Sequence, residues 1–233
     1  MNTLIDALGN AIELLVGLDP ALLEVVALTL QVTGIALVLA IVIGLPIGVA
    51  LGLRERVPLS GCLLPLIYTG MGLPPVVVGL FVYLFLSNQG VLGDLRWLFT
   101  PRAMIVAQTV IALPLMVGLT LTAVRSVDIP MRLQIRSLGA TRRQLAWAVL
   151  TEARLGVLAA VVAAFGSIIS EVGAVMLVGG NIENQTRVLT TAIVLETRKG
   201  NFALALALGI ILLMLAFAAN FVMYHLERGG NTE

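Results

Sequence analysis

The sequence predicts an all-α polytopic membrane protein with five transmembrane helices and one long cytoplasmic loop. Hydrophobic residues make up 59% of the chain and charged residues only 12%, and the mean hydropathy is +1.06. Ordinary soluble domains carry about 25% charged residues. Several uncharged apolar runs exceed the roughly 18 residues that mark a membrane-spanning helix. One long polar segment, residues 128–154, interrupts these runs; we call it the polar loop.

The composition also argues against several classes of function. The net charge is +1, which gives no basis for binding nucleic acid. Cys62 is the single cysteine and His225 the single histidine, so we expect no internal disulfide, no metal site and no Ser–His catalytic pair within the membrane. The sequence has no glycine-rich phosphate loop that ends in lysine. We therefore expect a non-catalytic chain with no cofactor of its own.

The chain begins with a segment of different character from the rest. Residues 1–20 are acidic, and their apolar residues recur at intervals of about four. This pattern predicts a short amphipathic helix on the outer surface of the membrane, and a frayed terminus is the alternative. The first span is predicted over residues 21–53, where Pro46 permits a kink. Arg54, directly after it, places this end in the cytoplasm.

The second span, predicted over residues 59–87, is interrupted near its middle. Gly70, Gly72, Pro74 and Pro75 follow one another closely there. A break at membrane depth frees backbone groups, which is tolerated only against protein or a water-filled cavity. The break is therefore a candidate lining of a translocation path, with a simple packing kink as the alternative.

Three further spans are predicted over residues 103–124, 155–178 and 202–224. Between the last two, residues 188–195 are apolar but too short to cross the bilayer. They are expected either to dip into the membrane and return or to lie across its outer mouth. The transmembrane domain is thus predicted over residues 21–226, with a cytoplasmic tail at 227–233.

The distribution of basic residues predicts an outer N-terminus and a cytoplasmic C-terminus. Nine lie on the predicted inner side and five on the outer side, in agreement with the positive-inside rule. The inner ones are Arg54, Arg56, Arg125, Arg132, Arg136, Arg142, Arg143, Arg154 and Arg228, and the outer ones are Arg96, Arg102, Arg187, Arg198 and Lys199.

Local rules predict that the polar loop forms two helices separated by a glycine turn. Asp128 and Pro130 are typical of a helix start. Gly139 is typical of a helix end, and Thr141 with Gln144 has the spacing of a capping box that starts the next helix. Within the first helix, an apolar stripe and a separate basic row are expected; the stripe is Met131, Ile135 and Leu138, and the row is Arg132 and Arg136. A basic helix resting on anionic lipid is the alternative interpretation.

Glu171 is the one acidic residue placed well inside a predicted span. It lies about 24 Å along the helix from the inner boundary, near the outer edge of the membrane core. A carboxylate there is a functional candidate by default. The alternative is a structural ion pair with Arg187 or Arg198.

Hydrogen-bond donors gather just after the fourth predicted span. They could line a path for an anion, because donors and a cation replace the water around an oxyanion. A solvated outer loop is the alternative. These residues are Asn181, Thr186, Arg187, Thr190 and Thr191.

Several of these segments resemble the permease subunits of binding-protein-dependent ABC importers. Leu138-Gly139-Ala140 matches the centre of the loop by which such permeases dock their ATPase, and residues 152–154 resemble the stretch that follows it. Residues 72–87 and 170–210 are similar to the tungstate-type permeases of that family. Glu171, Gly173 and residues 180–182 also match a pattern of the related molybdate permeases.

The resemblance implies the core of a type-1 ABC importer permease, in the inner membrane of a prokaryote. It implies two copies of a cytoplasmic ATPase, which uses ATP, an extracytoplasmic oxyanion-binding protein, and a homodimer whose axis holds the path. ATPase coupling would then involve Met131, Arg132, Ile135, Arg136, Leu138, Gly139, Ala140, Thr141 and Gln144. The path or gate would involve Gly72, Pro74, Pro75, Glu171, Gly173, Asn181, Thr186, Arg187 and Thr190. A stand-alone anion channel is the competing interpretation, and it would have no need of a docking helix.

Overall fold

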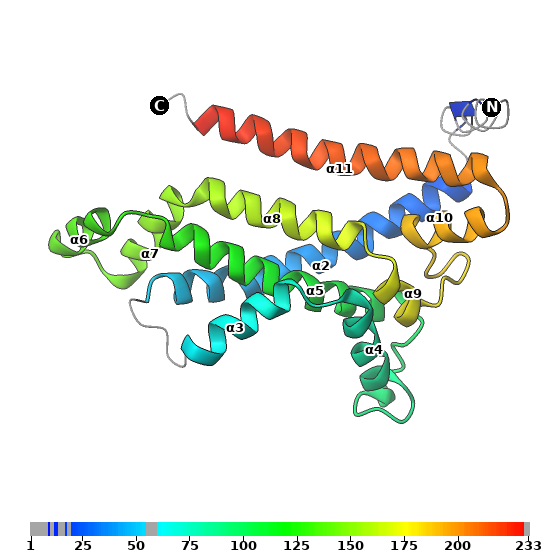
Figure 1. Ribbon diagram of the computed structural model, residues 1–233, viewed down its shortest axis with the longest axis horizontal. Helices are drawn as coiled ribbons and strands as arrows, with labels where there is room; N and C mark the ends of the chain where they lie inside the picture. Colours follow the sequence, from blue (N-terminus) through cyan, green and yellow to red (C-terminus); the bar gives the residue numbers. More distant parts are fainter. Residues whose placement is uncertain (1–8, 10–11, 14–16, 18–19, 55–59, 231–233) are drawn as a thin grey trace. The chain divides into compact units, whose positions relative to one another are not determined.

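The computed structural model describes residues 9, 12, 13, 17, 20–54 and 60–230 (Figure 1). Within these residues every regular element is a helix. The amphipathic helix expected over residues 1–20, Arg56 and the end of the cytoplasmic tail lie largely or wholly outside the described part. The helices are α2 (Pro20–Gly52), α3 (Ser60–Met71), α4 (Pro75–Leu86), the 3-10 helix η1 (Gly93–Leu95), α5 (Pro101–Arg125), α6 (Ile129–Ser137), α7 (Arg142–Glu152), α8 (Arg154–Ile169), α9 (Gly173–Gly179), α10 (Leu189–Arg198) and α11 (Phe202–Gly230).

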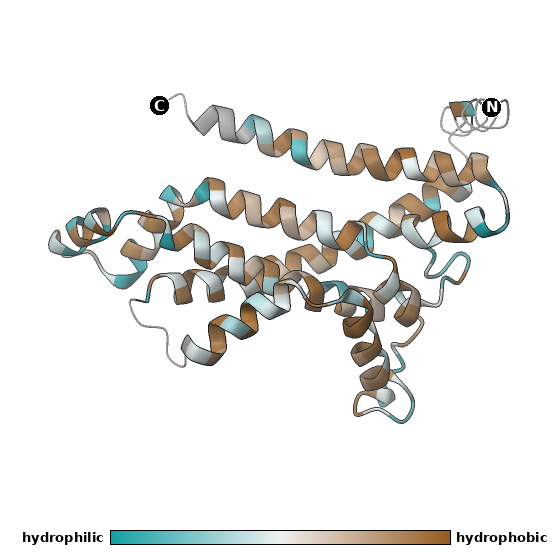
Figure 2. Cartoon of the chain, viewed as in Figure 1, coloured by the Kyte–Doolittle hydropathy of each residue, from teal (hydrophilic) through white to brown (hydrophobic). Residues whose placement is uncertain are grey.

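Three helices of the described part are long and apolar enough to cross a membrane by themselves: Leu22–Gly52, Pro101–Arg125 and Phe202–His225. These confirm the first, third and fifth predicted spans. Two further helix pairs, α3 with α4 and α7 with α8, qualify only when each broken pair counts as one span. The described helices therefore supply three to five spans, and five uninterrupted ones are not present. Figure 2 shows the hydrophobic residues that run along these helices.

The break predicted in the second span is present. α3 ends at Met71 and α4 begins at Pro75, with Pro74 before it. Prolines fit the first turn of a helix because their missing N–H would have no partner there. The turn between the helices is closed by hydrogen bonds from Gly72 N–H to the Thr69 carbonyl and from Leu73 N–H to the Gly70 carbonyl.

The fourth span differs from the prediction. α8 stops at Ile169, and the separate helix α9 begins only at Gly173. Ser170 contributes to the interruption, because its hydroxyl donates to the carbonyls of Gly166 and Ser167 and offers an alternative to the helical ladder. The 16 residues of α8 extend about 24 Å, less than the roughly 30 Å of a bilayer core.

The helices fall into two compact units, which we describe separately. The first comprises the described residues up to Ala36 together with Pro74–Gln108 and Gly166–Ala219. The second comprises Leu37–Leu73, Thr109–Phe165 and the described residues from Asn220 onward.

In the first unit, α10 packs against the beginnings of α2 and α11. Its buried contacts join Leu22 of α2, Leu189 and Ala192 of α10, and Ala207 and Leu208 of α11. The apolar run at 188–195, for which sequence left two placements open, is thus a packed helix.

A hydrogen bond from α10 to α2 adds to this packing. The buried Thr29 hydroxyl donates to the Val25 carbonyl and accepts from the N–H of Leu189, at the first turn of α10. We expect Thr29→Val to lower the free energy of unfolding by about 1–3 kcal/mol, because it leaves that buried N–H without a partner. Thr122→Val is the matched control, since the Thr122 hydroxyl donates only to its own helix, at Gly118. Equal thermal stability of the two variants in detergent would contradict the expectation.

In the second unit, α2 and α5 approach through glycines. Gly44, Gly48 and Gly52 are spaced by four on one face of α2. A Cβ added to them would lie 2.8 Å from Met116, 2.7 Å from Thr120 and 2.6 Å from Val124, all on α5. Small residues at this spacing let membrane helices pack at backbone distance, so this seam holds the two long helices together.

Candidate functional site

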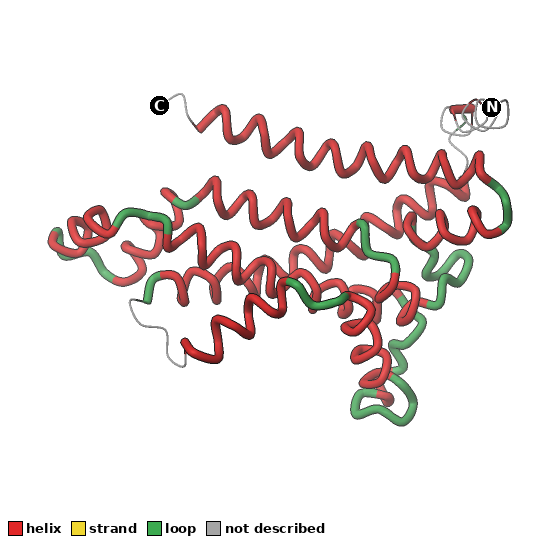
Figure 3. The backbone as a smooth tube through the Cα atoms, viewed as in Figure 1, coloured by secondary structure: helices red, strands yellow, loops and turns green. Residues whose placement is uncertain are grey.

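The polar loop has the predicted helix–turn–helix form, whose turn is visible between α6 and α7 in Figure 3. Gly139 has a φ of +82°. The Thr141 hydroxyl accepts from the N–H of Gln144, and the Gln144 side chain accepts from the N–H of Thr141, so the capping box is complete. One detail was wrong: Asp128 occupies the N-cap position, but its side chain makes no capping hydrogen bond.

The apolar stripe predicted for α6 is divided between the interior and the surface. Met131 and Ile135 pack against the core formed by Val124, Leu145 and Val149. Leu138 lies beyond the end of α6, and 88% of it is exposed. It therefore does not continue the face of the other two residues.

Large apolar side chains of α6 and α7 nevertheless face outward. They are Ile129, Leu133, Leu138 and Trp147, each more than half exposed. Trp147 is 73% exposed, and tryptophan is enriched among the residues that dominate protein–protein contacts. The outward apolar surface of the loop is thus built from these residues rather than from Met131 and Ile135.

Arg132 points inward, not along an exposed basic row. Its guanidinium donates to the carbonyls of Gly52, at 3.4 Å, and of Val124. These carbonyls belong to the last turns of α2 and α5, where the partial negative charge of a helix end favours a cation. Burial, then the nearby Arg136 and Arg125, hold the pKa of the Arg132 guanidinium below its ordinary value, and it remains charged. Arg132 thus ties α6 to both long helices, a contact that the sequence did not predict.

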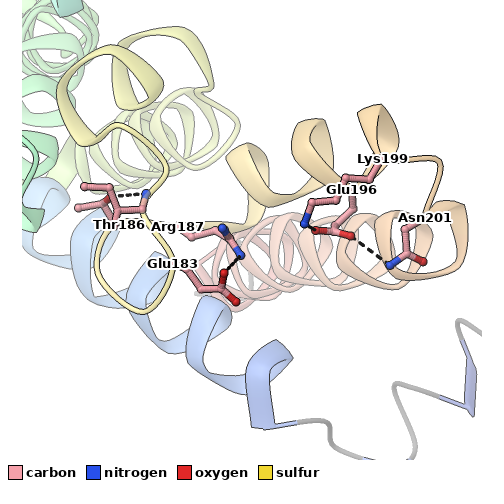
Figure 4. A network of polar contacts seen from close by, with 7 residues as sticks. Glu183, Thr186, Arg187, Glu196, Lys199 and Asn201 are labelled. Carbon is pink, nitrogen blue, oxygen red and sulfur yellow. Dashed lines mark hydrogen bonds and ion pairs between the residues drawn. The ribbon is translucent and has the colours of Figure 1, made fainter.

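Glu171 lies in the break between α8 and α9 rather than inside a helix. Its carboxylate Oε1 accepts from the N–H of Ala174 at 2.9 Å, in the first turn of α9. Its backbone carbonyl accepts from the Thr190 hydroxyl at 2.8 Å. Glu171 forms no ion pair with Arg187 or Arg198, the alternative that the sequence left open; Arg187 pairs instead with Glu183 at 3.5 Å (Figure 4).

The break also has a partner in α5. The side-chain amide of Gln108 donates to the Ile168 carbonyl at 3.1 Å, and Gln108 is buried. That carbonyl lies at the interrupted end of α8, where helical donors run out. Gln108 therefore supports the broken conformation, a role that only the three-dimensional contact reveals.

Helices α4 and α9, which both follow a break, pack closely on each other. A Cβ on Gly79 would lie 2.6 Å from the Cα of Ala174, and a Cβ on Gly173 would lie 2.5 Å from Val76. Neither helix, with 12 and 7 residues, is long enough to cross a membrane. The pair places Gly173 against Val76, next to Pro74 and Pro75 at the start of α4, whereas Gly72 belongs to the other unit.

Most of the donors predicted after α9 are used within the protein. The Thr186 hydroxyl donates to the Gly179 carbonyl and accepts from the N–H of Ile182. Thr191 accepts from the N–H of Val188. Asn181 adopts a φ of +52°, and its side-chain oxygen is buried without a protein partner. Arg187 also keeps unused capacity, because its Nε is a buried donor without a partner.

Arg187 borders a small pocket of about 250 Å³ beside the first part of α2. Glu24 and Gln31 of α2 contribute to its lining, together with Glu183, which is 72% exposed. Because two carboxylates lie next to one guanidinium, the pocket in this conformation does not favour the binding of an anion.

A second polar cluster closes the turn between α10 and α11 (Figure 4). The buried Glu196 carboxylate accepts from Lys199 Nζ at 2.9 Å and from the Asn201 amide at 3.0 Å. The hydrogen bond from Lys199 is the main cause that lowers the pKa of Glu196 below its ordinary 4.5, with burial opposing it.

The Glu196 cluster predicts a pH-dependent stability. A carboxylate whose pKa is lower in the folded state stabilises the fold fully above its unfolded pKa, and the contribution is lost as the pH falls through the folded value. We expect Glu196→Gln to lower the midpoint of thermal unfolding at pH 7, and the difference from the wild type to shrink as the pH falls from the ordinary value of 4.5 through the lowered pKa of Glu196. Because Lys199 is largely exposed, the effect is at most about 1 kcal/mol. A difference that persists unchanged at low pH would contradict this origin.

Comparison with known proteins identifies relatives over nearly the whole chain. Residues 44–230 match the family model for the binding-protein-dependent transport system inner membrane component. The chain is 46% identical over 204 residues to the probable anion ABC transporter permease protein of Haloferax volcanii, covering 85% of this chain and 88% of that protein. It is 37% identical to the tungstate uptake system permease protein TupB of Peptoclostridium acidaminophilum, covering 97% of this chain and 99% of that protein. Against the molybdenum transport system permease protein ModB of Escherichia coli, identity is 28% over 72% of this chain.

Solved structures share the fold at low sequence identity. An inward-facing structure of the MetNI methionine ABC transporter aligns with a TM-score of 0.74 at 21% identity, covering 90% of this chain and 95% of that one. A bacterial ABC transporter involved in the import of alginate aligns with a TM-score of 0.73 at 19% identity. At such identity the likeness establishes the permease fold and no substrate.

Proposed function

The chain belongs to the family of binding-protein-dependent transport system inner membrane components, and from this premise we propose that it is the membrane-spanning subunit of an ATP-driven importer of tungstate. The observation that carries the proposal is the 37% identity to a tungstate permease over almost the full length of both chains. The more distant molybdenum permeases make molybdate the natural competing anion.

We infer the partners of the chain from its family and from the geometry of the polar loop. A cytoplasmic ATPase would receive the outward apolar residues of α6 and α7 in a groove, as a helix-in-groove contact. Gly139 fixes the turn between the two helices, and Arg132 connects α6 to the long helices. An extracytoplasmic oxyanion-binding protein would deliver the anion, and two copies of the chain would enclose the path on their axis. The proposed orientation places the polar loop and the C-terminus in the cytoplasm.

Transport in proteoliposomes tests the proposed function. The full-length chain is reconstituted with its ATPase and loaded binding protein, and tungstate accumulation is followed with and without ATP. We expect tungstate accumulation to depend on ATP. Excess molybdate should inhibit this accumulation less than excess unlabelled tungstate does. Anion flux that needs no ATP and no ATPase would instead establish a channel. Faster accumulation of molybdate would reassign the substrate within the oxyanion class.

For the path itself we propose the break between α8 and α9, its neighbour α4, and Arg187. We expect Arg187→Gln to lower tungstate uptake severalfold without loss of ATPase binding, because it removes the cation beside the outer loop. Glu183→Gln is the matched variant, since it removes the ion-pair partner but keeps the cation, and its uptake should equal or exceed that of the wild type. If both variants lose uptake equally, the ion pair acts on structure and the path lies elsewhere.

A further inference from the structure

A groove of about 810 Å³ lies in the second unit between the last turns of α2 and the helices α6 and α7. Its volume falls within the roughly 300–1,000 Å³ of small-molecule sites. Of the residues that line it, only Arg136 belongs to the residues assigned above to ATPase coupling or to the transport path. It is lined by Leu45, Pro46, Val49, Ala50, Leu53, Arg54, Arg136, Arg142, Leu145, Ala146 and Leu150.

The walls of the groove are hydrocarbon. Five of the lining residues follow one another on a single face of α2, from Leu45 to Leu53. This face extends about 12 Å along the helix axis, close to half of the bilayer core. Leu145 and Leu150 of α7 provide the opposite wall. A ligand that fills the groove must therefore be largely apolar and elongated.

The end of the groove is basic. Arg54 follows α2, Arg136 lies in the last turn of α6, and Arg142 begins α7. Residues far apart in the sequence thus bring three arginines to the border of one groove, and none of the described residues that line it is acidic. Guanidinium groups match the geometry of phosphate oxygens.

We propose that this groove binds an anionic phospholipid, with an acyl chain along the α2 face and the headgroup phosphate at the three arginines. Basic sites between helices at the membrane surface recognise lipid headgroups in this way. A free oxyanion such as phosphate or tungstate would use only the basic end and would gain nothing from some 12 Å of apolar wall. The bound lipid would brace α6 and α7 against α2, so that the lipid composition of the membrane affects the loop on which coupling depends.

Lipid retention tests the proposal without any transport step, so its failure is distinguishable from failure of the transport function. The full-length chain, extracted with its ATPase, is exchanged into detergent with phosphatidylglycerol or phosphatidylcholine, washed, and analysed by native mass spectrometry. We expect the wild type to retain phosphatidylglycerol and not phosphatidylcholine. In the double variant Arg54→Gln/Arg142→Gln, which keeps Arg136, the affinity for phosphatidylglycerol should fall by about fivefold for each arginine removed.

Two further variants separate the site from general charge attraction. Arg143 neighbours Arg142 on α7 but does not line the groove, so Arg143→Gln should retain phosphatidylglycerol as the wild type does. Ala50→Phe keeps every arginine and fills the groove from an exposed position, so it should lose the lipid. Equal loss in Arg143→Gln and the double variant, or undiminished binding by Ala50→Phe, would overturn the proposal. Displacement of the lipid by millimolar inorganic phosphate or tungstate would also overturn it and identify a small-oxyanion site.

Discussion

Replacing Gly139 with valine is expected to abolish ATP-driven uptake while the protein remains in the membrane. Gly139 has a φ of +82°, and a Cβ placed there would meet no atom within 4 Å. The penalty is therefore one of backbone conformation, about 1–2 kcal/mol for an L residue and more for a β-branched one. The turn between α6 and α7 would open, and the outward apolar residues would no longer present one surface to the ATPase. Uptake in proteoliposomes and co-purification of the ATPase should both fall at least tenfold.

Two control variants separate a specific effect of the Gly139 turn on coupling from a general effect of backbone strain. Gly139→Asn should keep most of the uptake, because asparagine tolerates the left-handed region. Gly200 has nearly the same conformation, with a φ of +79° and open space around its Cβ, but it lies in the turn before α11. Gly200→Val should lower thermal stability and keep the ATPase bound. Normal uptake by Gly139→Val would refute the coupling role of the polar loop.

The parts of the fold that the sequence predicts are those set by local chemistry. The turn at Gly139 and the capping box of Thr141 with Gln144 involve groups no more than five residues apart, so their geometry follows from residue type and spacing. The three uninterrupted spans follow from long apolar runs. The break at Pro74 and Pro75 follows from two residues without an N–H.

The parts that the sequence misses depend on contacts between distant segments. The end of α8 at Ile169 could not be predicted from residue types alone, because Gln108 of α5 completes the interruption by donating to the Ile168 carbonyl. The inward orientation of Arg132 depends on where α2 and α5 end, and a helical wheel of α6 alone places it on the surface. The glycine seam of α2 did carry a readable signal, three glycines spaced by four, whose partner helix became evident only in the structure.

Arg132 is the second position at which a substitution is expected to have a large effect. Arg132→Met retains the length and apolar stem of the side chain but removes both hydrogen bonds to the ends of α2 and α5. We expect it to lower the free energy of unfolding by about 2 kcal/mol, since hydrogen bonds from a charged group are strong but this one is partly screened by solvent. Uptake should fall at least tenfold, because α6 would be released from the helices that it must move.

Arg132→Lys and Arg143→Met complete the test. A lysine ammonium is a point charge that reaches one carbonyl, whereas the guanidinium fork reaches two, so Arg132→Lys should lie between the wild type and Arg132→Met in both stability and uptake. Arg143 is exposed on α7, and its replacement by methionine should change neither. ATPase binding separates the two possible roles of Arg132. If Arg132→Met unfolds like the wild type but loses the ATPase, the arginine contacts the partner directly. If the ATPase stays bound and its hydrolysis no longer drives uptake, Arg132 transmits the movement of α6 to α2 and α5.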